Sequence, residues 1–480
     1  MKHFRGSLVV VAVLILLGVA SSNALAQVPT NLHYPPRTIG ELNKMAVSSF
    51  VYGVYRRHLS APGALPTVAS DEPTVASGPG KLITAANRAP IAVAPYESVI
   101  SQGTITMDAA VDVEPAIIKQ TNSTGSGTII VHMKYDTNGL SNFYYYTTAN
   151  GNAPAKLDPP AYYTQTGDPF LTESQLDSGQ SQRRVYLTGL VTNFPFTWAV
   201  AVWHSDNLGQ SWTLGTNLLA AGTSDLDKPT CDVSHHSGSA GYLFVAYRKI
   251  LYGTTHEIHV ARSTDGGNSF DQDVVVASST NVLNVANVVV SSSSGYVYVN
   301  WVDFSANPQK LYLARSQYAG SLSGTWTPDS SGPTGYFFVN TGDYMNGNLR
   351  GMTVPMMRHN WPAGKLSLVW HEKEASGSHL ADVYYAAYTT SGWQSKVKIS
   401  NESPNCGSSH TDQFMPALDH DSNGDVLVTY YDRQNNCSNS EYRLYFTKIT
   451  SSGSQLQAPT DARAVRPRRL SRGVTTNVPM

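Results

Sequence analysis

Charged residues are scarce in this chain of 480 residues. They make up 14% of the sequence, whereas a soluble globular protein carries about 25%. The two signs nearly cancel, with 33 Lys and Arg against 34 Asp and Glu, which argues against nucleic acid as a partner. The polar residues are instead Ser, Thr, Asn, Gly and Tyr, which favour strands and turns over long exposed helices. We therefore predict a mainly β-structured protein.

Long apolar runs are also rare, and the one that occurs is at the start. Leu8 to Val19 follows Lys2 and Arg5 and precedes the small-x-small site at 24–26, which is the pattern of a secretory signal peptide over 1–26. A run of about a dozen apolar residues falls short of the ~20 that cross a bilayer, so a retained anchor is the weaker alternative. We expect a secreted or periplasmic protein with no stable membrane span.

Cysteine occurs three times, as Cys231, Cys406 and Cys437. An exported protein can oxidise one pair and leave one thiol over. Cys231 lies in an apolar-flanked run and is expected to be a buried thiol. Cys406 and Cys437 lie in two polar loops, so we predict that they form a disulfide.

Both ends of the chain differ in composition from its middle. Within 27–107, Pro-Thr-Val-Ala-Ser occurs twice, at 66–70 and 73–77, among Pro, Ala, Gly and Ser. This is typical of a linker-like extension. The segment 454–480 places five arginines among prolines, and we interpret it as a flexible basic tail rather than a binding arm.

The middle, 108–453, repeats one pattern of alternating apolar residues. Clear copies of its first segment are GYLFVAYR, GYVYVNWV, GKLSLVWH and GDVLVTYY, which begin at Gly241, Gly295, Gly364 and Gly424. Second segments end at 148, 205, 263, 316, 388 and 449, with spacings of 57, 58, 53, 72 and 61 residues. Period-two alternation between turn residues predicts strands. Several strands per repeat, six times over, predict a six-bladed β-propeller in an all-β fold.

Two of the turns after the second segments carry a motif. Both resemble the Asp-box, Ser-x-Asp-x-Gly-x-Ser/Thr-Trp/Phe, although one copy has Asn in the Asp position. The matching residues are Ser205, Asn207, Gly209 and Trp212 in one copy, and Ser263, Asp265, Gly267 and Phe270 in the other. The chain therefore resembles the sialidase superfamily of Asp-box (bacterial neuraminidase repeat) propellers. The resemblance implies a structural role for these turns, on the face opposite the active site.

Catalytic sialidases share an Arg-Ile-Pro motif, two further arginines, an acid Asp and a Tyr–Glu pair. This chain has no Arg-Ile-Pro, so it departs from them and those residues cannot be carried over by motif. Propeller topology instead gathers candidates at one mouth of the channel. The candidate catalytic residues are Tyr431 and Glu372 as nucleophile and base, with Asp412 or Asp168 as the acid. The candidate substrate-binding residues are Arg248, Arg350 and Arg433 as an anion clamp, and Lys228, Asp303 and Trp198.

Each of these residues also has a plainer interpretation. The charged ones can be inter-blade ion pairs around the channel, and Trp198 can be buried packing. Asp419-x-Asp421-x-Asn423-Gly424-Asp425 resembles the start of a calcium loop, but its twelfth position is Tyr430 instead of Glu. A tight hairpin turn explains it better. We expect no metal and no cofactor.

Three function classes stay open from the sequence. The first is a propeller that recognises a glycan at its charged mouth, as a divergent glycoside hydrolase. The second is a non-catalytic propeller that binds a protein or a surface polysaccharide. The third and weakest is a polysaccharide lyase. In each case we expect a monomer.

The disulfide is the first testable prediction. Cys406 precedes the sixth blade and Cys437 follows that blade's second strand, so propeller topology places both on one face. A bridge there requires a Cα separation of roughly 5.5 Å. Closing a loop of about 30 residues would stabilise the fold by roughly 3 kcal/mol on the chain-entropy model. Mass mapping of the unreduced protein should find the two cysteines in one linked peptide pair, and two free thiols would contradict the prediction.

Overall fold

The computed structural model describes most of the chain from Asp112 to Asp461. The described ranges are 112–122, 125–135, 140–149, 154–174, 183–193, 197–222, 224–251, 255–339, 344–345, 349–360, 364–375, 377–401, 410–421, 423–434, 437–438, 442–450 and 455–461. The predicted signal peptide, the extension 27–107 and most of the predicted tail lie outside these residues. No α-helix occurs within the described ranges.

The described strands form six antiparallel sheets, the blades of a six-bladed β-propeller. Blade 1 contains β1 (Asp112–Asn122), β2 (Gly125–Tyr135), β3 (Ser141–Thr147) and β4 (Ala155–Leu157). Blade 2 contains β5 (Gln165–Glu173), β6 (Val185–Asn193), β7 (Thr197–Ser205), β8 (Thr213–Leu214) and β9 (Leu219–Gly222). Blade 3 contains β10 (Asp225–Val233), β11 (Leu243–Leu251), β12 (Thr255–Ser263) and β13 (Gln272–Ser279).

The second half of the ring follows the same order. Blade 4 contains β14 (Leu283–Val290), β15 (Val297–Asp303), β16 (Gln309–Arg315) and β17 (Thr334–Gly335). A short hairpin of β18 (Tyr344–Met345) and β19 (Leu349–Arg350) follows. Blade 5 contains β20 (Met356–Asn360), β21 (Lys365–Lys373), β22 (Ala381–Thr389), β23 (Gly392–Trp393) and β24 (Val397–Lys398). Blade 6 contains β25 (Gln413–His420), β26 (Val426–Asp432), β27 (Arg443–Ile449) and β28 (Gln455–Asp461).

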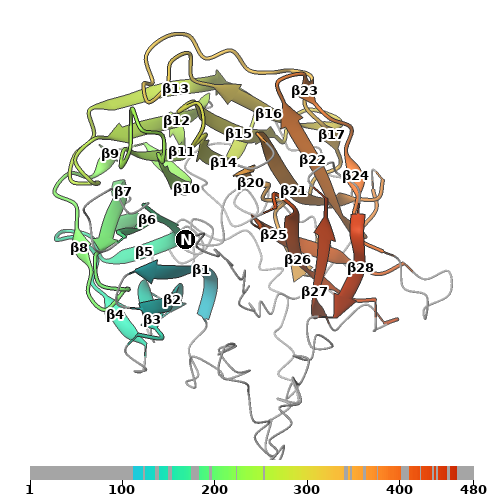
Figure 1. The fold of residues 1–480 in the computed structure, drawn as a ribbon, viewed down its shortest axis with the longest axis horizontal. Coiled ribbons are helices and arrows are strands. Elements are labelled where there is room, and N and C mark those ends of the chain that lie inside the picture. The colour runs from blue at the N-terminus through green and yellow to red at the C-terminus, as the bar shows by residue number, and fades with distance from the viewer. Residues whose placement is uncertain are drawn as a thin grey trace, which may run out of the picture.

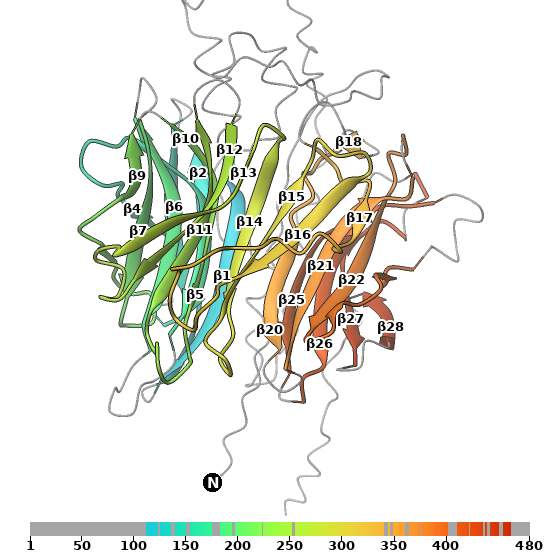
Figure 2. The same ribbon diagram turned by 90° about the horizontal axis from the view of Figure 1, so that it is seen from above.

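The first strand of each blade faces the centre of the ring. Figure 1 shows β1, β5, β10, β14, β20 and β25 around a common centre, with the later strands of each blade farther out. Figure 2, turned by 90°, shows the strands running between the same two faces of the molecule. The sixth sheet continues past the predicted boundary at 453, because β28 pairs with β27. The sequence of β28, QLQAPTD, is short and mostly polar, so it lacks the alternation of apolar and polar residues that predicts a strand.

Both faces of the central strands are buried. β6 is buried at every position except its last, and the same holds for β21. Blades 2 to 5 each pack between two neighbours, so polar residues of their strands that alternate with apolar ones in the sequence face another sheet instead of solvent. Burial on both faces is the reason that several polar side chains of these strands need partners inside the protein.

An aromatic pair recurs at equivalent positions of the second and third strands. The paired residues are His132 and Tyr144, Tyr247 and His259, Trp301 and Tyr312, Trp370 and Tyr384, and Tyr430 and Tyr445, with ring centroids 5.1–6.3 Å apart. Each pair consists of direct cross-strand neighbours, and such pairs stabilise a sheet. The aromatic residue that ends each repeat in the sequence therefore supplies packing between blades.

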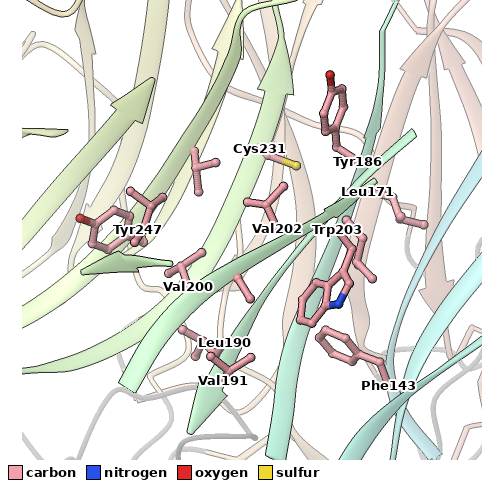
Figure 3. Close-up of a cluster of buried hydrophobic side chains, with 14 of the residues drawn as sticks. Phe143, Leu171, Tyr186, Leu190, Val191, Val200, Val202, Trp203, Cys231 and Tyr247 are labelled. Carbon is pink, nitrogen blue, oxygen red and sulfur yellow. The ribbon is translucent and has the colours of Figure 1, made fainter. Parts of the chain in front are cut away.

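Blade 2 departs from this pattern. Its equivalent pair is Gly189 and Ala201, and the ring of Phe143 from blade 1 fills the space, in edge contact with Trp203 at 5.7 Å. Figure 3 shows Phe143 and Trp203 side by side in this cluster. A methyl carbon added to Gly189 would overlap the Phe143 ring.

Two hairpins carry the hydrogen bonds that the turn motif requires. In one, the Asp265 carboxylate accepts from the amide of Ser269 at 2.8 Å and from the Ser263 hydroxyl at 2.8 Å. In the other, the side chain of Asn207 accepts from the amide of Ser211 at 2.9 Å. Gly209, Gly266 and Gly267 have positive φ, which glycine adopts without strain. Trp212 and Phe270 then return to the core between blades.

The packing at Gly189 gives the second prediction. Gly189→Val should lower the free energy of unfolding by about 1–3 kcal/mol, because the new side chain must displace Phe143 in a filled core. Chemical denaturation measures this change, and Gly238→Ala in an exposed turn is the control. Adding Phe143→Leu to Gly189→Val should recover part of the loss. Equal stability of Gly189→Val and the wild type would show that the two blades do not pack as described.

Candidate functional site: the channel mouth

The innermost strand of each blade begins, and the second strand ends, at the same face of the ring. This face is the mouth of the channel. Near that face the innermost strands of blades 2, 3, 4 and 6 contain an irregularity in register. One residue of each has a left-handed backbone: Asp168 (φ 54), Lys228 (φ 47), Val285 (φ 55) and Met415 (φ 50). Non-glycine residues adopt this conformation rarely and at a cost. The bulge is therefore a repeated feature that orients side chains at the mouth.

Blades 2 and 3 are joined at the mouth by an ion pair. The ammonium of Lys228 donates to Oδ1 of Asp168 at 3.0 Å. The Asp168 side chain is almost completely buried, whereas 20% of the Lys228 side chain is exposed. Both are bulge residues of adjacent innermost strands. Sequence analysis predicted both for the mouth, and the structure brings them together.

A second network joins blades 3 and 4. Arg248 lies 3.5 Å from Oδ2 of Asp227, and Nδ2 of Asn284 donates to the same oxygen at 2.9 Å. Burial raises the pKa of Asp227, and the nearby Asp168 raises it further. Nη2 of Arg248 contacts Nδ1 of His256 at 2.7 Å. Burial and Arg248 lower the pKa of His256 to about 2, so its imidazole is neutral and accepts this hydrogen bond.

Blade 6 has a buried ion pair of its own. Nη1 of Arg433 donates to Oδ2 of Asp412 at 2.8 Å, and both side chains are nearly inaccessible, with 3% and 0% exposure. Oδ1 of Asp412 accepts from the amide of Ala381 in blade 5 at 3.0 Å. Asp412 thus connects two blades and holds a buried guanidinium. A carboxylate engaged in this way is a structural group, as the plainer interpretation of the sequence expected.

Two of the three arginines of the proposed anion clamp already bind other side chains. Arg248 is bound by Asp227 and His256, whereas Arg433 is bound by Asp412 in a different blade. Arg350 is described only by its backbone, which pairs with Tyr344 in the short hairpin, so its side chain lies outside the described residues. Two of the three guanidinium groups therefore serve separate ion pairs.

Tyr431 and Glu372 also have different surroundings. Glu372 accepts from Nε1 of Trp370 at 3.0 Å and pairs with Lys396 within blade 5. Burial raises the pKa of Glu372, and Lys396 opposes the rise. The ring of Tyr431 packs against Phe414 and Tyr442 in blade 6, at 5.6 and 5.1 Å. These contacts support packing and ion pairing rather than a nucleophile–base pair.

The last two predicted site residues have local structural roles. Asp303 accepts from Nδ2 of Asn281 at 2.7 Å and from the amide of Ser305 at 2.9 Å, which stabilises the turn after β15. Trp198 is completely buried in the core cluster of blades 1 to 3. Its ring has no exposed surface on which a sugar can stack, so buried packing is the interpretation that fits.

Among the described residues, Arg358 and Phe170 form a contact between innermost strands of opposite blades. The guanidinium carbon of Arg358, in innermost strand β20 of blade 5, lies 5.8 Å from the centroid of the Phe170 ring in innermost strand β5 of blade 2. Two carboxylates lie close enough to Arg358 to have their pKa affected by it. They are Asp232 in blade 3 and Asp419 in blade 6, and burial raises the pKa of both while Arg358 opposes the rise.

The calcium-like segment is a hairpin turn that contains its own cation. Oδ1 of Asp421 accepts from the amides of Asn423 and Asp425 at 2.9 and 3.0 Å. The ammonium of Lys448 lies 2.8 Å from Asp421 and 2.9 Å from Asp425. The described residues contain no group of three His, Cys, Asp or Glu arranged to hold a metal ion, and no helix among them is long and apolar enough to span a membrane.

The cysteines are only partly described. Cys231 is a buried free thiol, and burial raises its pKa to about 12. Cys437 is in a disulfide-bonded state. Cys406, its predicted partner, lies outside the described residues, so the pairing itself stays a prediction.

Sequence reasoning missed several residues that the structure places at the mouth. Asn284 and His256 complete the Asp227–Arg248 network, and Lys396 neutralises Glu372. Asn284 stands where the sequence of blade 3 has Asp227, one residue before the bulge. Alignment of the repeats on this bulge could have found it. His256 and Lys396 carry no such signal, because they lie on outer strands or loops.

Comparison with known proteins adds little beyond the architecture. No family model matches this chain, and no curated protein matches it. One similar solved structure is a protein of unknown function from Dyadobacter fermentans, with 13% identity, a TM-score of 0.43 and coverage of 72% of this chain and 93% of that one. Another is an endo-arabinase from Bacteroides thetaiotaomicron, with 15% identity, a TM-score of 0.33 and coverage of 59% and 93%.

A third similar structure is the Trypanosoma rangeli sialidase in complex with 2,3-difluorosialic acid. It shows 9% identity, a TM-score of 0.43 and coverage of 70% of this chain and 53% of the sialidase chain. This chain thus spans about half the length of that sialidase. None of these values is high enough to transfer an activity or a substrate.

The buried pair in blade 6 gives the third prediction. Asp412→Ala should lower the free energy of unfolding by about 3–5 kcal/mol, because the buried Arg433 loses the carboxylate that it binds. Asp158→Ala is the matched control, since the Asp158 side chain is 87% exposed, and its effect should stay within about 0.5 kcal/mol. Denaturant unfolding measures both. A fully stable Asp412→Ala variant would restore Asp412 as a candidate acid.

Proposed function

We propose that this protein is an exported propeller that binds a glycan at its channel mouth and does not hydrolyse it by the sialidase mechanism. The proposal is based on the Asp168–Lys228 pair and the adjoining Asp227–Arg248–Asn284 network. These groups come from three adjacent blades at one face, where the Lys228 side chain is partly exposed and Asp227, Arg248 and Asn284 form a buried network beside it. A sugar hydroxyl group can accept a hydrogen bond from the Lys228 ammonium.

The exposed part of Lys228 is the feature that makes this pair a binding site candidate. Asp168 fixes the ammonium position, while a fifth of the side chain is exposed. A fixed donor loses little conformational freedom when a ligand binds, which favours affinity. The strained backbone at both residues holds them in place before the ligand arrives.

Several contacts argue against the sialidase mechanism. That chemistry needs guanidinium forks that a substrate carboxylate can reach. Arg248 and Arg433 are already engaged by separate buried carboxylates. Tyr431 is packed among aromatic rings, and Glu372 is paired with Lys396.

A second candidate function is glycoside hydrolysis by a carboxylate pair. The observation that favours it is the raised pKa of Asp227 beside the carboxylate of Asp168. A carboxyl group whose pKa is raised beside a second carboxylate is an arrangement that glycosidases use. In this candidate function Asp227 is the acid and Asp168 is the base or nucleophile.

A glycan array and a turnover screen test the proposal, and this is the fourth prediction. The exported form of the protein should bind at least one glycan on the array and release no product from fluorogenic sialosides. Release of product from other glycosides, abolished by Asp227→Asn, would favour the second candidate function. A protein that binds no glycan would contradict both.

Matched variants test whether the glycan binds at the mouth. Lys228→Met should weaken binding about 10-fold or more, since a charge-assisted contact is worth roughly 1.5–3 kcal/mol. The double variant Asp168→Asn/Lys228→Met leaves no unpaired charge and separates lost binding from lost stability. Lys156→Met is the control on an outer strand. Unchanged binding in the double variant would place the site elsewhere.

A further inference from the structure

An exposed tyrosine stands on the same face as the mouth. Tyr162 is 65% exposed, which is the largest value among the large apolar side chains of the described residues. It lies in the segment that leads into β5, six residues before Asp168. Its neighbour Tyr163 is buried, and the two rings meet edge to face at 5.5 Å. One tyrosine of the pair thus fixes the segment to the core and the other extends into solvent.

The backbone of Tyr162 is strained. Its φ of 82° lies in the region that bulky residues almost never occupy. Asp168, Lys228, Val285 and Met415 share a positive φ, but each of them belongs to a bulge inside a sheet. The Tyr162 side chain gains little burial in return for its strain. A turn accounts for the angle, because the amide of Tyr163 donates to the carbonyl of Pro160 at 3.0 Å and Tyr162 is the third residue of that turn.

The hydroxyl of Tyr162 has a polar neighbour among the described residues. Its hydroxyl lies 3.5 Å from the hydroxyl of Thr197, the first residue of β7. Thr164 donates to the side-chain oxygen of Asn193, the last residue of β6, at 3.4 Å. These residues belong to the ends of β5, β6 and β7 that face the mouth. An aromatic ring bordered by hydroxyl and amide groups suits a ligand with one apolar face and polar edges.

We propose that Tyr162 is a stacking platform for a neutral sugar ring, at the rim of the mouth where Asp168 and Lys228 bind another part of the same glycan. A pyranose ring has C–H groups on its face and hydroxyl groups around its edge. The C–H face covers the tyrosine ring and the hydroxyl groups reach Thr164, Thr197 and Asn193. This inference rests on the proposed function and extends it, because it requires a glycan of at least two residues.

A protein partner is the other occupant to consider. Protein interfaces bury a contiguous apolar centre, whereas the described contacts of Tyr162 are with the Tyr163 ring and the Thr197 hydroxyl. The other exposed large apolar side chains of the described residues, Val275, Tyr318 and Val397, lie on other elements and form no patch with it. The surroundings therefore favour a sugar.

Isothermal titration calorimetry with neutral oligosaccharides tests the platform, and this is the fifth prediction. Cellohexaose, xylohexaose, mannohexaose and chitohexaose are the probes. With the one that binds best, Tyr162→Ala should weaken binding about tenfold, which corresponds to the burial of roughly half an aromatic ring. Tyr162→Phe keeps the ring and should stay within about threefold of the wild type.

Two further variants separate binding from stability. Tyr318→Ala is the matched control, because Tyr318 is 54% exposed and follows the third strand of blade 4 on the opposite face. Its affinity should equal that of the wild type. Tyr162→Gly should bind as weakly as Tyr162→Ala and melt at a higher temperature, since glycine accepts a positive φ without strain.

The outcomes distinguish this inference from the proposed function. Unchanged affinity in Tyr162→Ala, together with lost affinity in Asp168→Asn/Lys228→Met, would overturn the platform and leave the mouth as the binding site. Absence of binding to all four oligosaccharides by the wild type would overturn the platform, because its ligand is a neutral sugar. A charged glycan that binds on the array would in that case still support the mouth.

Discussion

Packing between blades is the interaction on which the rest of this structure depends. A sheet of three or four short strands has two apolar faces and cannot bury either of them alone. Here the sheets of blades 2 to 5 bury both faces against their neighbours, and aromatic residues of the second and third strands belong to the clusters between them. Where blade 2 has Gly189 and Ala201 instead, Phe143 of the preceding blade occupies the space. The ring therefore tolerates exchange of residues between blades as long as the volume stays filled.

The same burial decides what the charged residues near the centre can do. A charge that enters the space between two sheets must be paired or hydrogen-bonded there. Arg433 and Arg248 satisfy this with Asp412 and Asp227, and Glu372 satisfies it with Lys396. These pairs hold neighbouring strands in position. The Lys228 ammonium is also paired, with Asp168, but a fifth of its side chain is exposed.

The fold could be predicted from the sequence because its signal is repeated. Six copies of an alternating segment with a terminal aromatic indicate six blades even where single copies are weak, and the turn motif at Ser263 indicates a hairpin.

The candidate site was less predictable. Topology places Arg248 and Arg433 at one face, but it does not say which carboxylate each of them meets. Asp227 and Asp412 lie 21 residues from their arginines along the chain, and only the register of β10 with β11, and of β25 with β26, brings them together. Trp198 illustrates the same limit, because the sequence around an aromatic residue beside a loop does not show whether its side chain faces solvent or the core. The exposed Tyr162 differs from the buried Tyr163 only in a backbone angle that no sequence pattern specifies.

The contact between Arg358 and Phe170 has a consequence for how this molecule can meet a polymer. The two side chains come from opposite blades. At their level, the contact between one arginine and one phenylalanine therefore limits the open width of the channel. A polysaccharide chain cannot be threaded through a ring that is crossed in this way. If the ligand is a long glycan, as we propose, it must either approach with one of its ends or lie across the face of the ring.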